Sequence, residues 1–372
     1  MGSFDFVLPD YGRSTLAEVL PSIAAHLTGS DAGMLNLPHA ERYVLFLLDG
    51  FGWNNLQASL RELDYLPELL GDSLKITAAI PSTTPISLTT LGTGLAPGEH
   101  GMIGYTFLEE STGKIIKPLD WPPFLNPSAF QPRPTIFEQL SGTAVSSIGD
   151  SRYSSSGLTE ASLRGADFVP IDGFNQQEWV QAVVKAALAG DTSLVYVYDR
   201  ELDHIGHSRG WESAEWLTAL INLDRRIEAL REALPSDVVL MITGDHGMLD
   251  IPRSKRIVIE DYPRLMQDVR QVAGEVRMRY LYTSRPAQVA ERWRQELGER
   301  AEVVTADEAI SANWFGNVSS PTRRRLGDVI VAAKDDWMLG TSSLAKELNL
   351  IGVHGSLTAQ EMEIPLLIDL GW

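Results

Sequence analysis

Short, almost uninterrupted apolar runs recur along this chain, and several of them end in an acidic or hydroxyl residue. Strands that are buried on both faces have continuous apolar sequences of this kind, which are typical of a mostly parallel sheet. We therefore expect an α/β fold in which a mostly parallel central sheet is flanked by helices. The expected strands are 43–49, 73–80, 143–150, 193–199, 238–245 and 364–370.

The helical patterns between these runs fit the same architecture. The clearest lies in 211–234, where six apolar residues at helical spacing form one stripe that predicts core packing. Its members are Trp216, Leu220, Leu223, Ile227, Leu230 and Leu234. With 372 residues and 44% hydrophobic content, the chain can bury a large core.

The segment 252–345 interrupts this alternation of strands and helices, because it has strand and helix patterns of its own. They are RMRYLYT, AQVAERWRQEL and DVIVAA. We expect a small inserted α+β cap there. Residues 1–251 and 346–372 then form the main α/β domain. The proline-rich stretch 106–135 predicts a long ordered loop without regular structure, which either roofs a site or covers a sheet edge.

Composition excludes several classes of protein. The chain has no cysteine, so disulfides, thiolate metal ligands and cysteine nucleophiles are ruled out. A formal net charge of −18 argues against binding to nucleic acids or to anionic membranes. The N-terminal residues have no basic segment before an apolar stretch, and no run is long enough to span a bilayer. A cytoplasmic location is the resulting expectation, with a secreted form whose leader has been removed as the alternative.

Seven residues have the donor chemistry of one metal centre. Aspartate and histidine recur next to glycine in LDHIGH, GDHGM and GVHGS, and an aspartate and a threonine follow expected strands. Together they offer enough oxygen and nitrogen donors for two divalent ions. Such a centre with a hydroxyl among its ligands is suited to attack on phosphorus. The residues are Asp49, Thr84, Asp203, His207, Asp245, His246 and His354.

The expected nucleophile lies in the sequence PSTTP. Because proline is favoured in the first helical turn, we expect Thr84, just before Pro85, to be the N-cap of a helix through Ser87 to Leu91. A hydroxyl there lies in the positive field of the helix N-terminus, which stabilises an alkoxide and a phosphoryl group. Thr83 competes for this role, but its side chain is expected to turn elsewhere.

The histidines divide into two groups. Asp203 and His207 are four residues apart, so both can face one ion from a single helical turn, whereas His204 between them is expected to point away. The remaining histidines are His26, His39 and His100, to which we assign structural roles.

With these motifs in place, the chain resembles the alkaline phosphatase superfamily and, within it, the type I phosphodiesterase/nucleotide pyrophosphatase family. IPSTTPISLTTLGTG aligns without gaps to the nucleophile segment of that family, with Pro81, Thr84, Thr93 and Gly94 at matching positions. The resemblance extends from about residue 43 to the C-terminus and implies an alkaline-phosphatase-like fold. It also implies one zinc ion held by Asp203, His207 and His354, and a second by Asp49, Thr84, Asp245 and His246.

The chain departs from the family at one position. Where the family has a phosphate-binding asparagine 21 residues after the nucleophile, this chain has Tyr105. A phenol donates one hydrogen bond where an amide offers two donors, so the pocket is not a copy. We assign Tyr105 to substrate binding, with a core aromatic as the alternative.

The function predicted from the sequence is metal-dependent cleavage of phosphodiester or pyrophosphate bonds through a phosphothreonine intermediate. The substrate is a small phosphate ester, which includes nucleotides. Zinc suits the imidazole and carboxylate ligands best, with manganese and iron as alternatives. A phosphomonoesterase, a phosphonate hydrolase and a catalytically silent binding protein remain alternatives. A sulfatase is excluded because the chain has no cysteine and PSTTP lacks the arginine of its motif.

Overall fold

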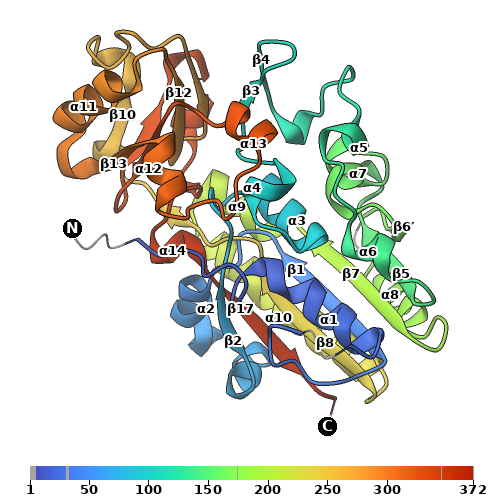
Figure 1. The fold of residues 1–372 in the computed structure, drawn as a ribbon. Helices are drawn as coiled ribbons and strands as arrows, with labels where there is room; N and C mark the ends of the chain where they lie inside the picture. The colour runs from blue at the N-terminus through green and yellow to red at the C-terminus, as the bar shows by residue number, and fades with distance from the viewer. Residues whose placement is uncertain (1–5, 31–32, 174, 345, 372) are drawn as a thin grey trace.

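The computed structural model describes residues 6–30, 33–173, 175–344 and 346–371, and its centre is a seven-stranded sheet. The strand order is β2-β17-β8-β1-β7-β5-β6 (Figure 1). In chain order the strands are β1 (Arg42–Leu48), β2 (Leu74–Thr77), β5 (Ala144–Gly149), β6 (Asp167–Pro170), β7 (Ser193–Asp199), β8 (Val238–Gly244) and β17 (Glu363–Asp369).

The sheet is mostly parallel, as the apolar runs predict. β1 pairs in parallel with β7 and β8, and β5 pairs in parallel with β7 and β6. Only β17 runs antiparallel to its neighbours, β8 and β2. All six expected strands are present, although β2 covers only half of its run. β6 was missed because it is short, only half-buried and ends in Pro170.

Successive residues of β1 point to two different cores, which explains its continuous apolar sequence. Tyr43 and Leu45 pack in one core and Val44 and Phe46 in the other. Helices α1 (Val19–Leu27), α3 (Thr84–Thr93), α6 (Ile136–Gln139) and α7 (Gly157–Leu163) contribute to the first core. Helices α2 (Trp53–Ser59), α8 (Gln176–Ala187), α9 (Glu201–Arg209) and α10 (Ala214–Ala233) contribute to the second. All six residues of the predicted stripe lie in this core; the last of them, Leu234, directly follows α10.

A separate four-stranded antiparallel sheet lies beside the main one, at the upper left of Figure 1. Its order is β11-β12-β14-β13. Leu281 and Val331 pack under α11, while Tyr280 and Ile330 join the first core of the main sheet. The elements are β11 (Gln271–Gly274), β12 (Met278–Tyr282), α11 (Pro286–Leu297), β13 (Ala301–Thr305), α12 (Ala306–Ser311), α13 (Ser320–Arg325) and β14 (Val329–Ala333). This smaller sheet lies within 252–345, the segment expected to form the cap. The bounds of that cap remain a prediction.

The proline-rich stretch contains regular structure, so the expectation of an irregular loop was wrong. Its prolines start elements instead of interrupting them: Pro118 opens a 3-10 turn, and Pro127 opens α5 behind the capping side chain of Asn126. The stretch contains the hairpin β3 (Phe107–Glu109) and β4 (Lys114–Ile116), followed by α5 (Pro127–Phe130).

The remaining short elements connect these parts. They are α4 (Pro97–His100), β9 (Leu249–Asp250), β10 (Arg256–Val258), β15 (Met338–Gly340), β16 (Gly352–Val353) and α14 (Ala359–Met362). β9 pairs with β16 and β10 with β15. No helix in the described ranges has the length and apolar character needed to cross a bilayer.

Candidate active site

The predicted ligands converge at the carboxyl ends of three adjacent parallel strands. Asp49 follows β1, Asp245 follows β8, and Asp203 lies in α9 just after β7. The backbone N–H of Asp203 donates to the carbonyl of Asp49 over 3.1 Å, which fixes α9 against the end of β1. His354 comes directly after β16, which the pairing with β9 holds beside the segment that follows His246. Strand order therefore assembles a site from distant segments.

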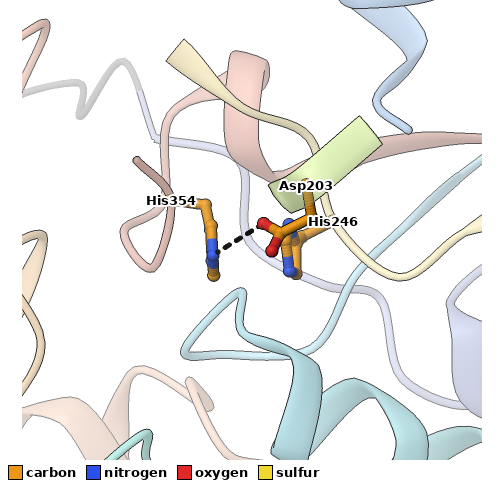
Figure 2. Close-up of side chains that lie close together, drawn as sticks. All are labelled: Asp203, His246 and His354. Carbon is orange, nitrogen blue, oxygen red and sulfur yellow. Dashed lines mark ion pairs between the residues drawn. The ribbon is translucent and has the colours of Figure 1, made fainter. Parts of the chain in front are cut away.

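The four-residue spacing in LDHIGH brings its two ligands together, as predicted. In α9 the Nε2 atom of His207 lies 3.2 Å from Oδ1 of Asp203, and the Nε2 atom of His354 lies 3.5 Å from the same oxygen. Figure 2 shows the Asp203 carboxylate beside the rings of His246 and His354. Those two rings stack with their centroids 3.6 Å apart.

The turn after β8 presents the second half of the site. Oδ1 of Asp245 accepts hydrogen bonds from the backbone N–H groups of Gly50 and His246, each 3.0 Å long, so Oδ2 is left to face inward. Oδ2 lies 3.4 Å from Nε2 of His246. The turn needs glycine at 247, because a Cβ there would lie 2.0 Å from the carbonyl oxygen of Gln360.

The backbone sets the tautomer of all three histidines. The Nδ1 atom of His207 lies 2.8 Å from the carbonyl oxygen of Gly352. The Nδ1 atom of His246 lies 3.1 Å from the carbonyl oxygen of Gly247, and that of His354 lies 2.8 Å from the carbonyl oxygen of Ser82. A carbonyl only accepts, so Nδ1 carries a proton and, in a neutral ring, Nε2 keeps its lone pair. Such outer hydrogen bonds orient metal-binding imidazoles.

The resulting contacts suit a bound cation. Each Nε2 lone pair faces a carboxylate oxygen at 3.2–3.5 Å, so two acceptors meet without a proton between them. Oδ1 of Asp203 and Oδ2 of Asp245 are buried and have no hydrogen-bond donor among the described residues. Two ligand atoms about 2.0 Å from one tetrahedral ion lie roughly 3.3 Å apart, so these separations fit metal ligation. The two donor groups are Asp203, His246 and His354, and Asp49, Asp245 and His246.

Electrostatics supports the same conclusion. Burial and the neighbouring carboxylates of Asp245 and Asp203 raise the pKa of Asp49 well above its ordinary value. Burial also raises the pKa of Asp245. Burial and the nearby His246 and His207 rings hold the pKa of His354 well below 6.5, so its imidazole is neutral. A divalent cation would stabilise three carboxylates and the neutral His354 imidazole in one cluster.

Thr84 is the threonine that enters this cluster. Its Oγ1 lies 3.4 Å from Oδ1 of Asp49 and 3.3 Å from Nε2 of His246. The expectation that Thr84 is the N-cap was wrong by one residue: Thr83 is the N-cap, Thr84 is the first residue of α3 and Pro85 is the second. The Thr83 hydroxyl is buried outside the cluster, next to the Glu275 carboxyl.

A cavity of about 360 Å³ opens beside Thr84 and holds residues that the sequence did not indicate. Its wall includes His204, which was expected to point away from the site. Tyr105 does not line this cavity; it is half-buried, and the Lys117 ammonium lies 5.1 Å from its ring centre. Besides Asp49, Thr84 and Asp203, the cavity is lined by Leu119, Arg152, Tyr153, Phe168, Tyr198 and Arg200, among others.

The family model for type I phosphodiesterase/nucleotide pyrophosphatase matches residues 43–357, which is most of the chain. The chain belongs to this family. All seven predicted ligands lie within the matched segment. Among curated relatives, ectonucleotide pyrophosphatase/phosphodiesterase family member 7 of Rattus norvegicus is 27% identical over 266 residues. That match covers 66% of this chain and 58% of the relative's length.

Solved structures show the same fold at low sequence identity. Phosphonoacetate hydrolase from Sinorhizobium meliloti 1021 has a TM-score of 0.67 and 19% identity, over 90% of this chain and 91% of that one. Murine ectonucleotide pyrophosphatase/phosphodiesterase 5, as an inactive variant in complex with AMP, has a TM-score of 0.65 and 16% identity, over 87% of each chain. The chain therefore shares its overall fold with these two proteins.

Proposed function

We propose that this family member cleaves phosphodiester or pyrophosphate bonds with Thr84 as the nucleophile and two divalent ions as cofactors. The position of Thr84 carries the proposal. Its hydroxyl is the one that lies within 3.5 Å of both Asp49 and His246, at the N-terminal end of α3. A hydroxyl among carboxylates and imidazoles at a helix N-terminus suits attack on an anionic phosphoryl group.

Asp203, His207 and His354 would hold one ion, and Asp49, Asp245, His246 and Thr84 the other. Bound divalent ions would lower the pKa of the Thr84 hydroxyl and neutralise charge on the phosphoryl oxygens. Oγ1 of Thr84 then forms a bond to phosphorus as the bond to the leaving oxygen breaks, giving phosphothreonine. Water hydrolyses that ester and regenerates the hydroxyl.

The substrate is proposed to be a small diester or pyrophosphate, which includes nucleotides. The cavity beside Thr84 is walled by the aromatic rings of Tyr153, Phe168 and Tyr198, which suit a planar or apolar substituent. The AMP complex of the murine structure supports a nucleotide of this size. The phosphonoacetate hydrolase structure makes a phosphonate the second candidate.

A matched substrate panel tests the proposal. The zinc- or manganese-loaded enzyme should turn over bis-p-nitrophenyl phosphate at least tenfold better in kcat/KM than p-nitrophenyl phosphate, which is about 1.4 kcal/mol of differential transition-state stabilisation. Phosphonoacetate serves as the phosphonate arm of the panel. If the monoester proved the better substrate at equal metal and pH, the diesterase assignment would give way to a phosphatase.

A further inference from the structure

We propose that Arg200 selects substrates that carry a second anionic group, a carboxylate or a phosphate, beyond the phosphoryl group that Thr84 attacks. This inference rests on the proposed function and refines its substrate class. Arg200 follows β7 directly, three residues before Asp203, and lines the same cavity as Thr84. One cavity therefore joins the nucleophile to a guanidinium group.

Of the two arginines in the cavity wall, Arg152 already has its charge compensated. Its Nη2 lies 2.6 Å from Oδ2 of Asp150, and its backbone N–H donates to Oδ1 of the same carboxylate over 3.0 Å. Asp172, whose carboxylate accepts the N–H of Ser151, adds further negative charge beside it. The guanidinium of Arg152 is thus already paired with Asp150, so Arg152 is the weaker candidate for binding an anionic group of the substrate.

Arg200 differs because its guanidinium has no ion pair and no hydrogen bond within the described part of the chain. The carboxylate of the adjacent Asp199 forms an ion pair with Arg226, so it does not neutralise the charge of Arg200. Arg200 is exposed, and its charge acts on Asp150 and on the ring hydroxyl of Tyr153, which places it at the same side of the cavity.

This placement matters in a chain of net charge −18. Most anions are repelled by such a protein at long range, so a substrate with extra negative charge needs a local cation besides the metal site. An unpaired guanidinium offers several N–H donors in a planar fork that matches a carboxylate or a phosphate. The residue therefore suits an acidic substituent on the substrate, with Tyr153 and Tyr198 lining the same cavity as Arg200 and Thr84.

Binding of three product-like ligands tests the proposal. Phosphoglycolate and ethyl phosphate share a phosphate monoester and differ by one carboxylate, and 2-phosphoethyl phosphate carries a phosphate in its place. Titration calorimetry with the metal-loaded full chain should show about tenfold tighter binding of both acidic ligands than of ethyl phosphate. Arg200→Gln should abolish that ratio. Arg209→Gln, a surface position on α9 outside the cavity wall, is the matched control and should preserve it.

The outcomes are separate from those of the proposed function, because binding is measured without turnover. Equal affinity of the wild-type protein for the acidic and neutral ligands would overturn the role of Arg200. So would a preference that survives Arg200→Gln. Preference for only one acidic ligand would identify which anion the residue recognises. If the preference held but no diester were hydrolysed, the catalytic proposal would fail while the specificity proposal stood.

Discussion

The hydroxyl of Tyr198 donates a hydrogen bond to Oδ2 of Asp49, so a side chain of β7 fixes the carboxylate that follows β1. The ring of Tyr153 packs edge-on against Tyr198, with centroids 5.6 Å apart. Oδ1 of the same carboxylate lies 3.4 Å from both Thr84 Oγ1 and His246 Nε2. Tyr198 therefore orients Asp49 toward Thr84 and the candidate metal site.

We expect Tyr198→Phe to weaken metal binding or turnover by about 10–100-fold, the usual effect of removing an outer partner of a metal ligand. The measurement is metal affinity from competition with a chelator, together with kcat and KM on bis-p-nitrophenyl phosphate. Tyr153→Phe is the control, because its hydroxyl makes no hydrogen bond within the described ranges, and it should retain its metal affinity. Metal affinity and kcat that both stay at the wild-type level in Tyr198→Phe would remove the positioning role of Tyr198.

The metal content should be about two divalent ions per chain. Asp203→Asn should lose close to one of them, because Asp203 Oδ1 is the oxygen that faces both His207 and His354. Elemental analysis after dialysis measures this. Glu201→Gln on the same helix, outside both donor groups, should keep the full content. A single ion in a fully active wild-type preparation would contradict the two-ion proposal.

Thr84→Ala should fold and bind metal but lose turnover by at least about 1,000-fold, because the attacking oxygen is gone. Thr84→Ser should keep part of the activity. Thr83→Ala removes a hydroxyl outside the ligand cluster, so its effect on kcat/KM should be far smaller. Trapping of phosphothreonine followed by peptide mapping identifies the position directly. A label on residue 83 would reverse the assignment.

Local sequence signals indicated which candidate ligands would lie close together, because each one lies at a feature with a known geometry. Asp49 and Asp245 follow apolar strands, so parallel pairing had to bring them to one edge of the sheet. The four-residue spacing of Asp203 and His207 gave one helical face. The error at Thr84 was a boundary error: proline tolerates the second helical position as well as the first, so the cap moved to Thr83.

Strand order and direction were not readable from these patterns. β17 has the same kind of apolar run as the parallel strands, yet it runs antiparallel, because the chain enters it from Glu361, whose carbonyl accepts the N–H of Gly247 beyond the carboxyl end of β8. The wall of the cavity depends on this topology too. Arg152 comes after β5 and Arg200 after β7, and only the pairing of these two strands brings both into one cavity. No spacing in the sequence indicated that contact.

The ion pair of Arg277 and Glu361 connects the smaller sheet to the active-site turn. Nε and Nη2 of Arg277 lie 2.9 and 2.8 Å from the two carboxylate oxygens, and both side chains are fully buried. The carboxylate also accepts the N–H of Ser356 over 2.9 Å. The backbone carbonyl of Glu361 accepts the N–H of Gly247 over 2.9 Å, next to His246. The pair is thus part of the support for the metal ligands.

Arg277→Met should destabilise the protein by about 3–5 kcal/mol, because it leaves a buried carboxylate without its cation. The double variant Arg277→Met with Glu361→Gln removes that charge and should recover a large part of the loss. Urea unfolding of the metal-free protein measures both, so that metal affinity does not enter the comparison. If the double variant were no more stable than Arg277→Met, the cost would come from packing around residue 277 rather than from an unpaired charge.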